Sequence, residues 1–185
     1  MTDGGIVPRF SRFVLYGLIQ IETKLDGLNE ARLRRFMIKA RKAVALNGDV
    51  SLLLTSNRVM QRLNRSFRRK NKPTDVLSFP AADPIAPKFA GDLAISVEIA
   101  SANAAALGHS LEAEVRILIL HGLLHLAGYD HESDDGRMAR KESRLRAQLG
   151  LPSNLIARTE GDPVKRKKPK PRGSSSPGNA ARRAR

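Results

Sequence analysis

Apolar residues recur along this chain with two different periods, and each period predicts a different kind of element. Residues 13–22 are rich in β-branched and aromatic side chains and predict a strand. In residues 29–46 apolar side chains recur every three or four positions, with Arg and Lys among the residues between them. This period predicts a helix. Its apolar stripe consists of Leu33, Phe36, Met37, Ala40 and Val44. Residues 50–55 are largely apolar, as in a strand at the centre of a sheet.

Residues 56–96 are expected to hold one helix and two further strands. Ser56 is suited to cap the helix. The apolar face of this helix is formed by Val59, Met60, Leu63 and Phe67. After a turn comes a strand at residues 76–79. The prolines and the glycine of residues 80–91 predict a loop, and residues 92–96 form a short strand after it.

The rest of the domain is predicted to be helical, with each helix directly after a serine. The helices are expected to run to Leu107 after Ser96, over residues 111–127 after Ser110, and to Leu149 after Ser133. His109, in the connector before Ser110, is expected on the surface. This order of elements predicts an α+β fold, with a small mixed four-stranded sheet packed with about five helices and the helix at 111–127 central.

Length and composition limit the number of domains, the possible metal ligands and the expected location of the protein. A chain of 185 residues can form one domain with its own core. Because it contains no cysteine, a metal site would have to use histidine and oxygen ligands. The first residues lack the basic and apolar segments of a secretory signal, and no apolar run approaches the ~20 residues needed to cross a bilayer. We therefore expect a cytoplasmic protein.

The net charge of +15 is unevenly distributed. Residues 161–185 hold nine Lys/Arg and one Asp, a charge of +8, and the remaining 160 residues carry +7. The last segment has almost no large apolar side chain, so we expect a folded domain over residues 1–160 and a disordered basic tail over 161–185. Such charge favours polyanionic partners, nucleic acid above all. An anionic membrane surface is disfavoured because no amphipathic basic helix stands out in the tail.

Three of the four histidines fall within residues 121–131, which read HGLLHLAGYDH. On a helix His121 and His125 share one face, with Cβ atoms about 5–6 Å apart, which suits two ligands of one metal ion. Gly128 can take the left-handed conformation that ends a helix and lets the chain bring His131 to a third ligand position. A lone histidine in an apolar helix is usually a core residue. Three at this spacing favour a site for one divalent ion, with zinc as the expected metal.

The spacing of these histidines is that of metzincin proteases, with one departure. H-E-x-x-H proteases carry a glutamate directly after the first histidine as the general base, and this chain has Gly122 there. Peptide hydrolysis is therefore disfavoured. Three histidines on a tetrahedral ion still leave one position open, as in catalytic zinc sites, where a bound water ionises near neutral pH.

Three segments resemble the YbeY family of bacterial rRNA-maturation endoribonucleases. They are residues 121–131, residues 71–80 with the upstream Phe67-Arg68, and residues 91–96. They occur in the order of the family, and the resemblance covers residues 48–150 well. It implies a single-strand-specific, metal-dependent endoribonuclease that acts in rRNA 3′-end maturation and ribosome quality control. Ribosomal RNA and components of the small ribosomal subunit would be its partners, and Arg68 would be a catalytic residue beside the metal.

The sequence alone leaves the roles of several charged residues open. The five cations of residues 64–72 form either a solvated helix end or a phosphate-binding patch. Asp130 and Glu132 flank His131, and we expect them to orient a ligand histidine rather than to act as a base. Asp75 and Asp92 are expected to be a turn residue and a strand-end residue.

Two other functions also remain. One is a non-catalytic ribosome-assembly factor that binds RNA and uses the metal only for structure. The other is a metzincin-like metallopeptidase.

Overall fold

A computed structural model describes residues 19–22, 26–81, 89–131 and 133–152 of the chain. Its elements are β1 (Ile19–Ile21), α1 (Glu30–Val44), β2 (Asp49–Thr55), α2 (Asn57–Arg68), β3 (Val76–Pro80), β4 (Phe89–Ser96), α3 (Val97–Leu107), α4 (Leu111–Leu126) and α5 (Arg137–Leu149). This order confirms the predicted α+β fold of five helices and a mixed four-stranded sheet, within the described residues.

The strands lie in the order β1-β2-β4-β3. β1, β2 and β4 are parallel neighbours, and β3 pairs with β4 in the antiparallel direction. β2 is flanked on both sides, which confirms the central position expected from its apolar sequence. Leu52 and Leu54 are at most 1% exposed, as in a strand covered by helices.

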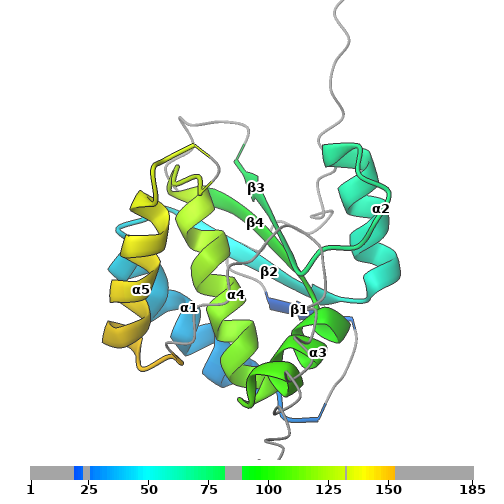
Figure 1. Cartoon of the computed structure of the whole chain (residues 1–185), viewed down its shortest axis with the longest axis horizontal. Coiled ribbons are helices and arrows are strands. Elements are labelled where there is room, and N and C mark those ends of the chain that lie inside the picture. The colour runs from blue at the N-terminus through cyan, green and yellow to red at the C-terminus, as the bar shows by residue number, and fades with distance from the viewer. Residues whose placement is uncertain (1–18, 23–25, 82–88, 132, 153–185) are drawn as a thin grey trace, which may run out of the picture.

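Helices cover both faces of the sheet (Figure 1). On one face, Leu52, Leu54, Leu93 and Ile95 belong to the main core together with the apolar stripes of α1, α4 and α5. On the other face, Leu77 and Ala94 pack with Met60 and Leu63 of α2. This division follows the two-residue period of the strands, which turns successive side chains to opposite faces. α4 packs against α1, α3, α5 and the sheet, so it is the central helix.

Several predicted boundaries were wrong. β4 begins at Phe89, so residues 89–91 are strand rather than loop, and Asp92 lies inside β4 instead of at its end. α5 begins at Arg137, three residues later than expected, where the Asp134 carboxylate accepts a hydrogen bond from the backbone N of Met138 (2.7 Å). Ser56 occupies the N-cap of α2 without a capping hydrogen bond from its side chain.

Two other caps were predicted correctly. The Oγ atoms of Ser96 and Ser110 accept hydrogen bonds from the backbone N of Ile99 (3.1 Å) and Ala113 (3.2 Å). Residues 13–18 of the first predicted strand, and the basic tail over 161–185, lie outside the described residues. Among the helices that the structure describes, none is long and apolar enough to cross a membrane.

His109 was wrongly expected on the surface. Its side chain is 10% exposed, and its Nε2 atom lies 2.8 Å from Oε2 of Glu114, a residue that is fully buried in the first turn of α4. The connector between α3 and α4 places the His109 side chain against the first turn of α4. A histidine next to glycine and serine in the sequence is thereby brought within hydrogen-bonding distance of a buried carboxylate.

Candidate metal centre

The C-terminal half of α4 presents His121 and His125 on one face. The two Nε2 atoms are 3.2 Å apart, and the ring centroids are 4.8 Å apart at an angle of 72°. His121 is largely buried, with 12% of its side chain exposed, and His125 is half-buried. The four-residue spacing thus brings both imidazoles together, as predicted.

Gly128 brings the third histidine back towards these two. Its φ is +84°, the left-handed conformation predicted for this position. The backbone N of Tyr129 donates to the carbonyl of Leu124 (3.0 Å) and closes the end of the helix. The His131 ring then lies 5.5 Å from that of His121 and 5.1 Å from that of His125, measured between centroids.

This arrangement fits one metal ion. One ligand nitrogen from each of His121, His125 and His131 lies within 4.8 Å of the others. Nitrogens bound to tetrahedral zinc at about 2.0–2.1 Å would be roughly 3.3 Å apart, close to the separation of the two Nε2 atoms on α4. The cluster can therefore hold a metal ion with little movement of the helix.

The electrostatics of the cluster favour the neutral form of His125. Burial lowers the pKa of His125 from its usual 6.5 to about 4, and the charges of His121, His131 and Arg68 act in the same direction. Asp130 has a weaker opposite effect on that pKa. Because a metal binds the neutral form of imidazole, this environment keeps His125 ready for coordination at neutral pH.

Glu142 of α5 holds the innermost histidine in place. Its Oε2 atom lies 3.0 Å from Nδ1 of His121, and its Oε1 atom accepts a hydrogen bond from Nε of Arg146 (2.9 Å). Burial acts to raise the pKa of Glu142, but the hydrogen bond and charge of His121 and the charge of Arg146 outweigh it, and the pKa falls to about 2. A carboxylate in this position fixes the imidazole so that Nε2 faces the cluster.

Sequence reasoning missed Glu142 and assigned the orienting role to Asp130 and Glu132. Asp130 is exposed and accepts a hydrogen bond from Oγ of Ser133 (2.9 Å), whereas Glu132 lies outside the described residues. A signal for Glu142 was present in the helical period of residues 137–149. Glu142 stands on the same stripe as Met138 and Leu145, where a carboxylate needs a buried partner.

Gly122 allows α4 to lie directly on the sheet. A Cβ atom at this position would be 2.6 Å from Cδ2 of Leu93 and 3.2 Å from Oγ of Ser78. The Ser78 hydroxyl also donates to the carbonyl of Gly122 (3.3 Å). At the position where a peptidase carries its glutamate, the space for a side chain is therefore occupied by Leu93 and Ser78 of the sheet.

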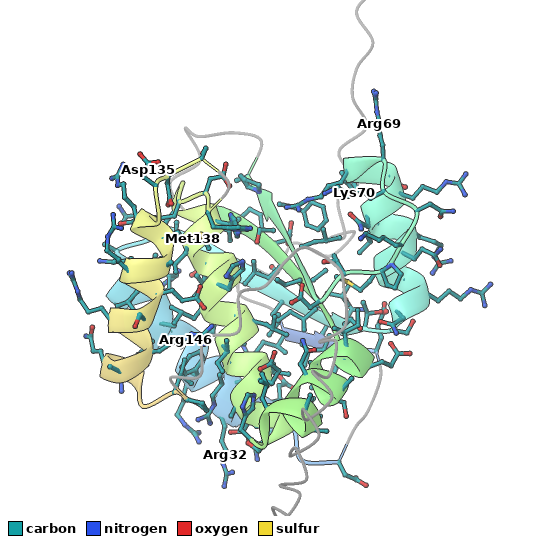
Figure 2. The ribbon with its side chains drawn as sticks, in the orientation of Figure 1. Arg32, Arg69, Lys70, Asp135, Met138 and Arg146 are labelled. Atoms are coloured by element: carbon teal, nitrogen blue, oxygen red, sulfur yellow. The ribbon has the colours of Figure 1, made fainter. Side chains whose placement is uncertain are left out.

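Arg68 is the last residue of α2, a helix on the opposite face of the sheet from α4 (Figure 1). Its charge contributes to the low pKa of His125, so the structure brings Arg68 into electrostatic range of the cluster. Figure 2 shows its neighbours Arg69 and Lys70 at the same end of α2. The following loop is anchored by Asn64, whose Nδ2 atom donates to the carbonyl of Lys72 (2.7 Å).

Two other acidic residues were assigned from the sequence. Asp75 accepts a hydrogen bond from the backbone N of Val76 (2.8 Å), as expected of a turn residue. Burial raises the pKa of Asp92, and a hydrogen bond with Ser51 acts in the opposite direction.

The chain is similar to known proteins over most of the residues that the structure describes. The family model "Endoribonuclease YbeY" matches residues 19–150. Proteins named endoribonuclease YbeY from Koribacter versatilis and Solibacter usitatus are 56% and 48% identical to this chain, over 77% and 72% of it and 91% and 88% of their own lengths. The solution structure of a protein from Thermotoga maritima matches with a TM-score of 0.50 at 29% identity, over 71% of this chain and 89% of that one. The chain therefore belongs to the endoribonuclease YbeY family.

Proposed function

We propose that this protein is a metal-dependent endoribonuclease that cleaves single-stranded RNA, with one zinc ion per chain bound by His121, His125 and His131. The observation that carries the proposal is the convergence of three imidazoles within range of an arginine. The family to which the chain belongs supports the choice of RNA as substrate.

Zinc suits the donor set. Imidazole nitrogen is one of its ordinary ligands, and three protein ligands are typical of its catalytic sites. The ion, when bound, supplies Lewis acidity to a water molecule and to the phosphate of the substrate. Glu142 contributes by holding His121 in the orientation and tautomer that ligation requires.

Arg68 is the residue that we assign to the transition state. Cleavage of a phosphodiester concentrates negative charge on the phosphate oxygens, and a guanidinium can contact two of them at once. Arg68 would also orient the RNA backbone over the cluster.

The biological substrate that we propose is ribosomal RNA, cleaved during 3′-end maturation and ribosome quality control in the cytoplasm. Components of the small ribosomal subunit would be its partners. A net charge of +15 supports an anionic partner of this size.

Two alternatives are less well supported. A metallopeptidase would need a general base, and the peptidase position, Gly122, packs against Leu93 with no room for a side chain. A non-catalytic assembly factor with a structural metal would need a fourth protein ligand, since structural zinc sites are closed. Among the described residues, the group that could hold a metal ion consists of the three histidines, without a fourth protein ligand.

Elemental analysis and RNA cleavage, measured on the same preparations, test the proposal. Protein purified without added metal should contain about one zinc per chain, and the triple His→Ala variant should lose both zinc and cleavage of single-stranded RNA. Casein should stay intact. Unchanged metal content in the triple variant would place the site elsewhere, and casein cleavage that depends on the histidines would support the peptidase alternative.

A further inference from the structure

Phe67 is one of two large apolar side chains that stand out as exposed in the described part of the chain. Its exposed fraction is 36%, and that of the other, Ile38 in α1, is 46%. Phe67 occupies the last turn of α2, directly before Arg68. An exposed aromatic ring directly before Arg68 is a candidate contact for a ligand that reaches the site.

The ring of Phe67 is held from one side by Phe79 of β3. Their centroids are 4.9 Å apart at an interplanar angle of 69°, an edge-to-face contact. Phe79 in turn packs against the buried cluster of Met60, Leu63, Leu77 and Ala94. Phe67 is thus a partly exposed ring that rests on a packed support.

This support lies at the end of α4 that carries the histidines. A Cβ atom on Gly91 would be 2.3 Å from the carbonyl oxygen of Phe79 and 2.9 Å from Cδ2 of Leu126, so β3, β4 and the last residue of α4 meet there. Leu126 directly follows His125. Arg68 acts electrostatically on His125, and Phe67 directly precedes Arg68 at the end of α2.

We infer that Phe67 is a stacking platform for one base of single-stranded RNA, next to the phosphate held by Arg68. The inference rests on the proposed function. Proteins that bind single strands combine cations along the backbone with aromatic rings under the bases, and every base offers a π-face. The neighbouring cations are Arg65, Arg69 and Lys70, all exposed. Stacking would fix the register of the strand without selecting a particular base.

The substitution Phe67→Trp gives a direct readout, because the chain contains no tryptophan. The new indole would be the single tryptophan of the protein, at the proposed platform. Titration with a short oligoadenylate should quench its fluorescence, whereas an abasic strand of the same length should leave it nearly unchanged. The matched reporter Ile38→Trp, at the other exposed apolar position, should respond to neither strand.

RNA affinity and cleavage rate, measured on two further variants, distinguish stacking of Phe67 on a base from packing of Phe67 within the protein. Phe67→Leu keeps apolar bulk against Phe79, while Phe67→Tyr keeps the ring. Loss of one stacked base should weaken oligoadenylate binding in Phe67→Leu by about 5- to 150-fold and leave binding of the abasic strand unchanged. Phe67→Tyr should bind as the parent does. The change should appear mainly in KM, since Phe67 does not contact the reacting phosphate.

Each outcome supports or overturns the inference. Equal oligoadenylate affinity in the parent and Phe67→Leu, or quenching that is equal for the abasic strand, would overturn the platform. Unfolding curves for all variants show whether the fold is retained, and Phe67→Tyr and Phe67→Trp keep the test valid if Phe67→Leu is unstable. Binding is measured independently of cleavage, so a protein that stacks RNA without cutting it would contradict the proposed function alone.

Discussion

Nδ1 of His121 lies 3.0 Å from Oε2 of Glu142, and this contact joins α4, which carries two of the three proposed ligands, to α5. The second oxygen of the same carboxylate is bound by Arg146. One buried carboxylate therefore orients a proposed ligand and also fixes α5 against α4. Removal of this carboxylate should therefore change two quantities that can be measured separately, the affinity for zinc and the free energy of unfolding.

Glu142→Gln should weaken zinc binding by about 10- to 100-fold, the usual effect of losing a carboxylate behind a ligand histidine. Competition with a chromophoric chelator measures the affinity. Glu114→Gln is a matched control, because Glu114 also pairs with a buried histidine, His109, but at the opposite end of α4. The control should lower the free energy of unfolding and leave zinc affinity unchanged. Equal zinc affinity in Glu142→Gln and the parent would remove Glu142 from the site.

Acid should destabilise the chelator-treated protein in two steps. Between pH 6.5 and about 4, unfolded His125 binds a proton that the folded state excludes, so the free energy of unfolding decreases as pH falls through that window. The contribution of Glu142 is complete above pH 4.5 and is lost as pH falls towards about 2. Urea titrations at a series of pH values measure both steps. The lower step should disappear in Glu142→Gln, and its persistence there would assign it to another carboxylate.

Gly122→Ala should reduce the free energy of unfolding, because the new methyl group meets the buried side chain of Leu93 and the hydroxyl of Ser78. Overpacking of this kind costs about 1–3 kcal/mol, against a gain of up to ~1 kcal/mol from replacing a helical glycine. Thermal and urea unfolding measure the difference. Leu93→Val in the same chain should recover part of the loss. A stabilised Gly122→Ala variant would show that α4 can move away from the sheet.

Arg68→Ala should retain zinc and the fold while RNA cleavage falls by about 10²–10³, the typical effect of losing one group that stabilises transition-state charge. Arg65→Ala, one turn earlier on α2 and exposed, is the control for a general loss of positive charge. It should reduce affinity slightly and leave the single-turnover rate unchanged. Full activity in Arg68→Ala, with contaminating nucleases excluded, would contradict the role of Arg68.

Deletion of residues 161–185 removes a charge of +8 and should flatten the dependence of RNA affinity on salt. Each phosphate that the tail neutralises on a single strand contributes about −0.7 to the slope of log affinity against log salt. Metal content and single-turnover cleavage at saturating RNA should stay close to those of the full chain. Identical slopes for the two proteins would mean that the tail does not contact RNA and that the +7 of the body accounts for the affinity.

The sequence alone was sufficient for features that depend on neighbours along the chain. Helical and strand periods predicted the order of the elements, because burial of one face is imposed every 3.6 or two residues. The spacing of His121, His125 and His131, with Gly128 between the last two, predicted their convergence for the same reason. A helical turn and a left-handed glycine are local geometry and do not depend on the rest of the fold.

Contacts between distant segments were decided only by the tertiary structure. Glu142 reaches His121 because α5 packs on α4. Arg68 comes within electrostatic range of His125 from the end of α2, where Phe67 packs on Phe79 of the edge strand β3. The need for glycine at position 122 depends on Leu93, and the burial of His109 depends on Glu114. Each of these relationships is set by how two elements are packed against each other. That packing follows from the shape of the whole core, which no local pattern of residues encodes.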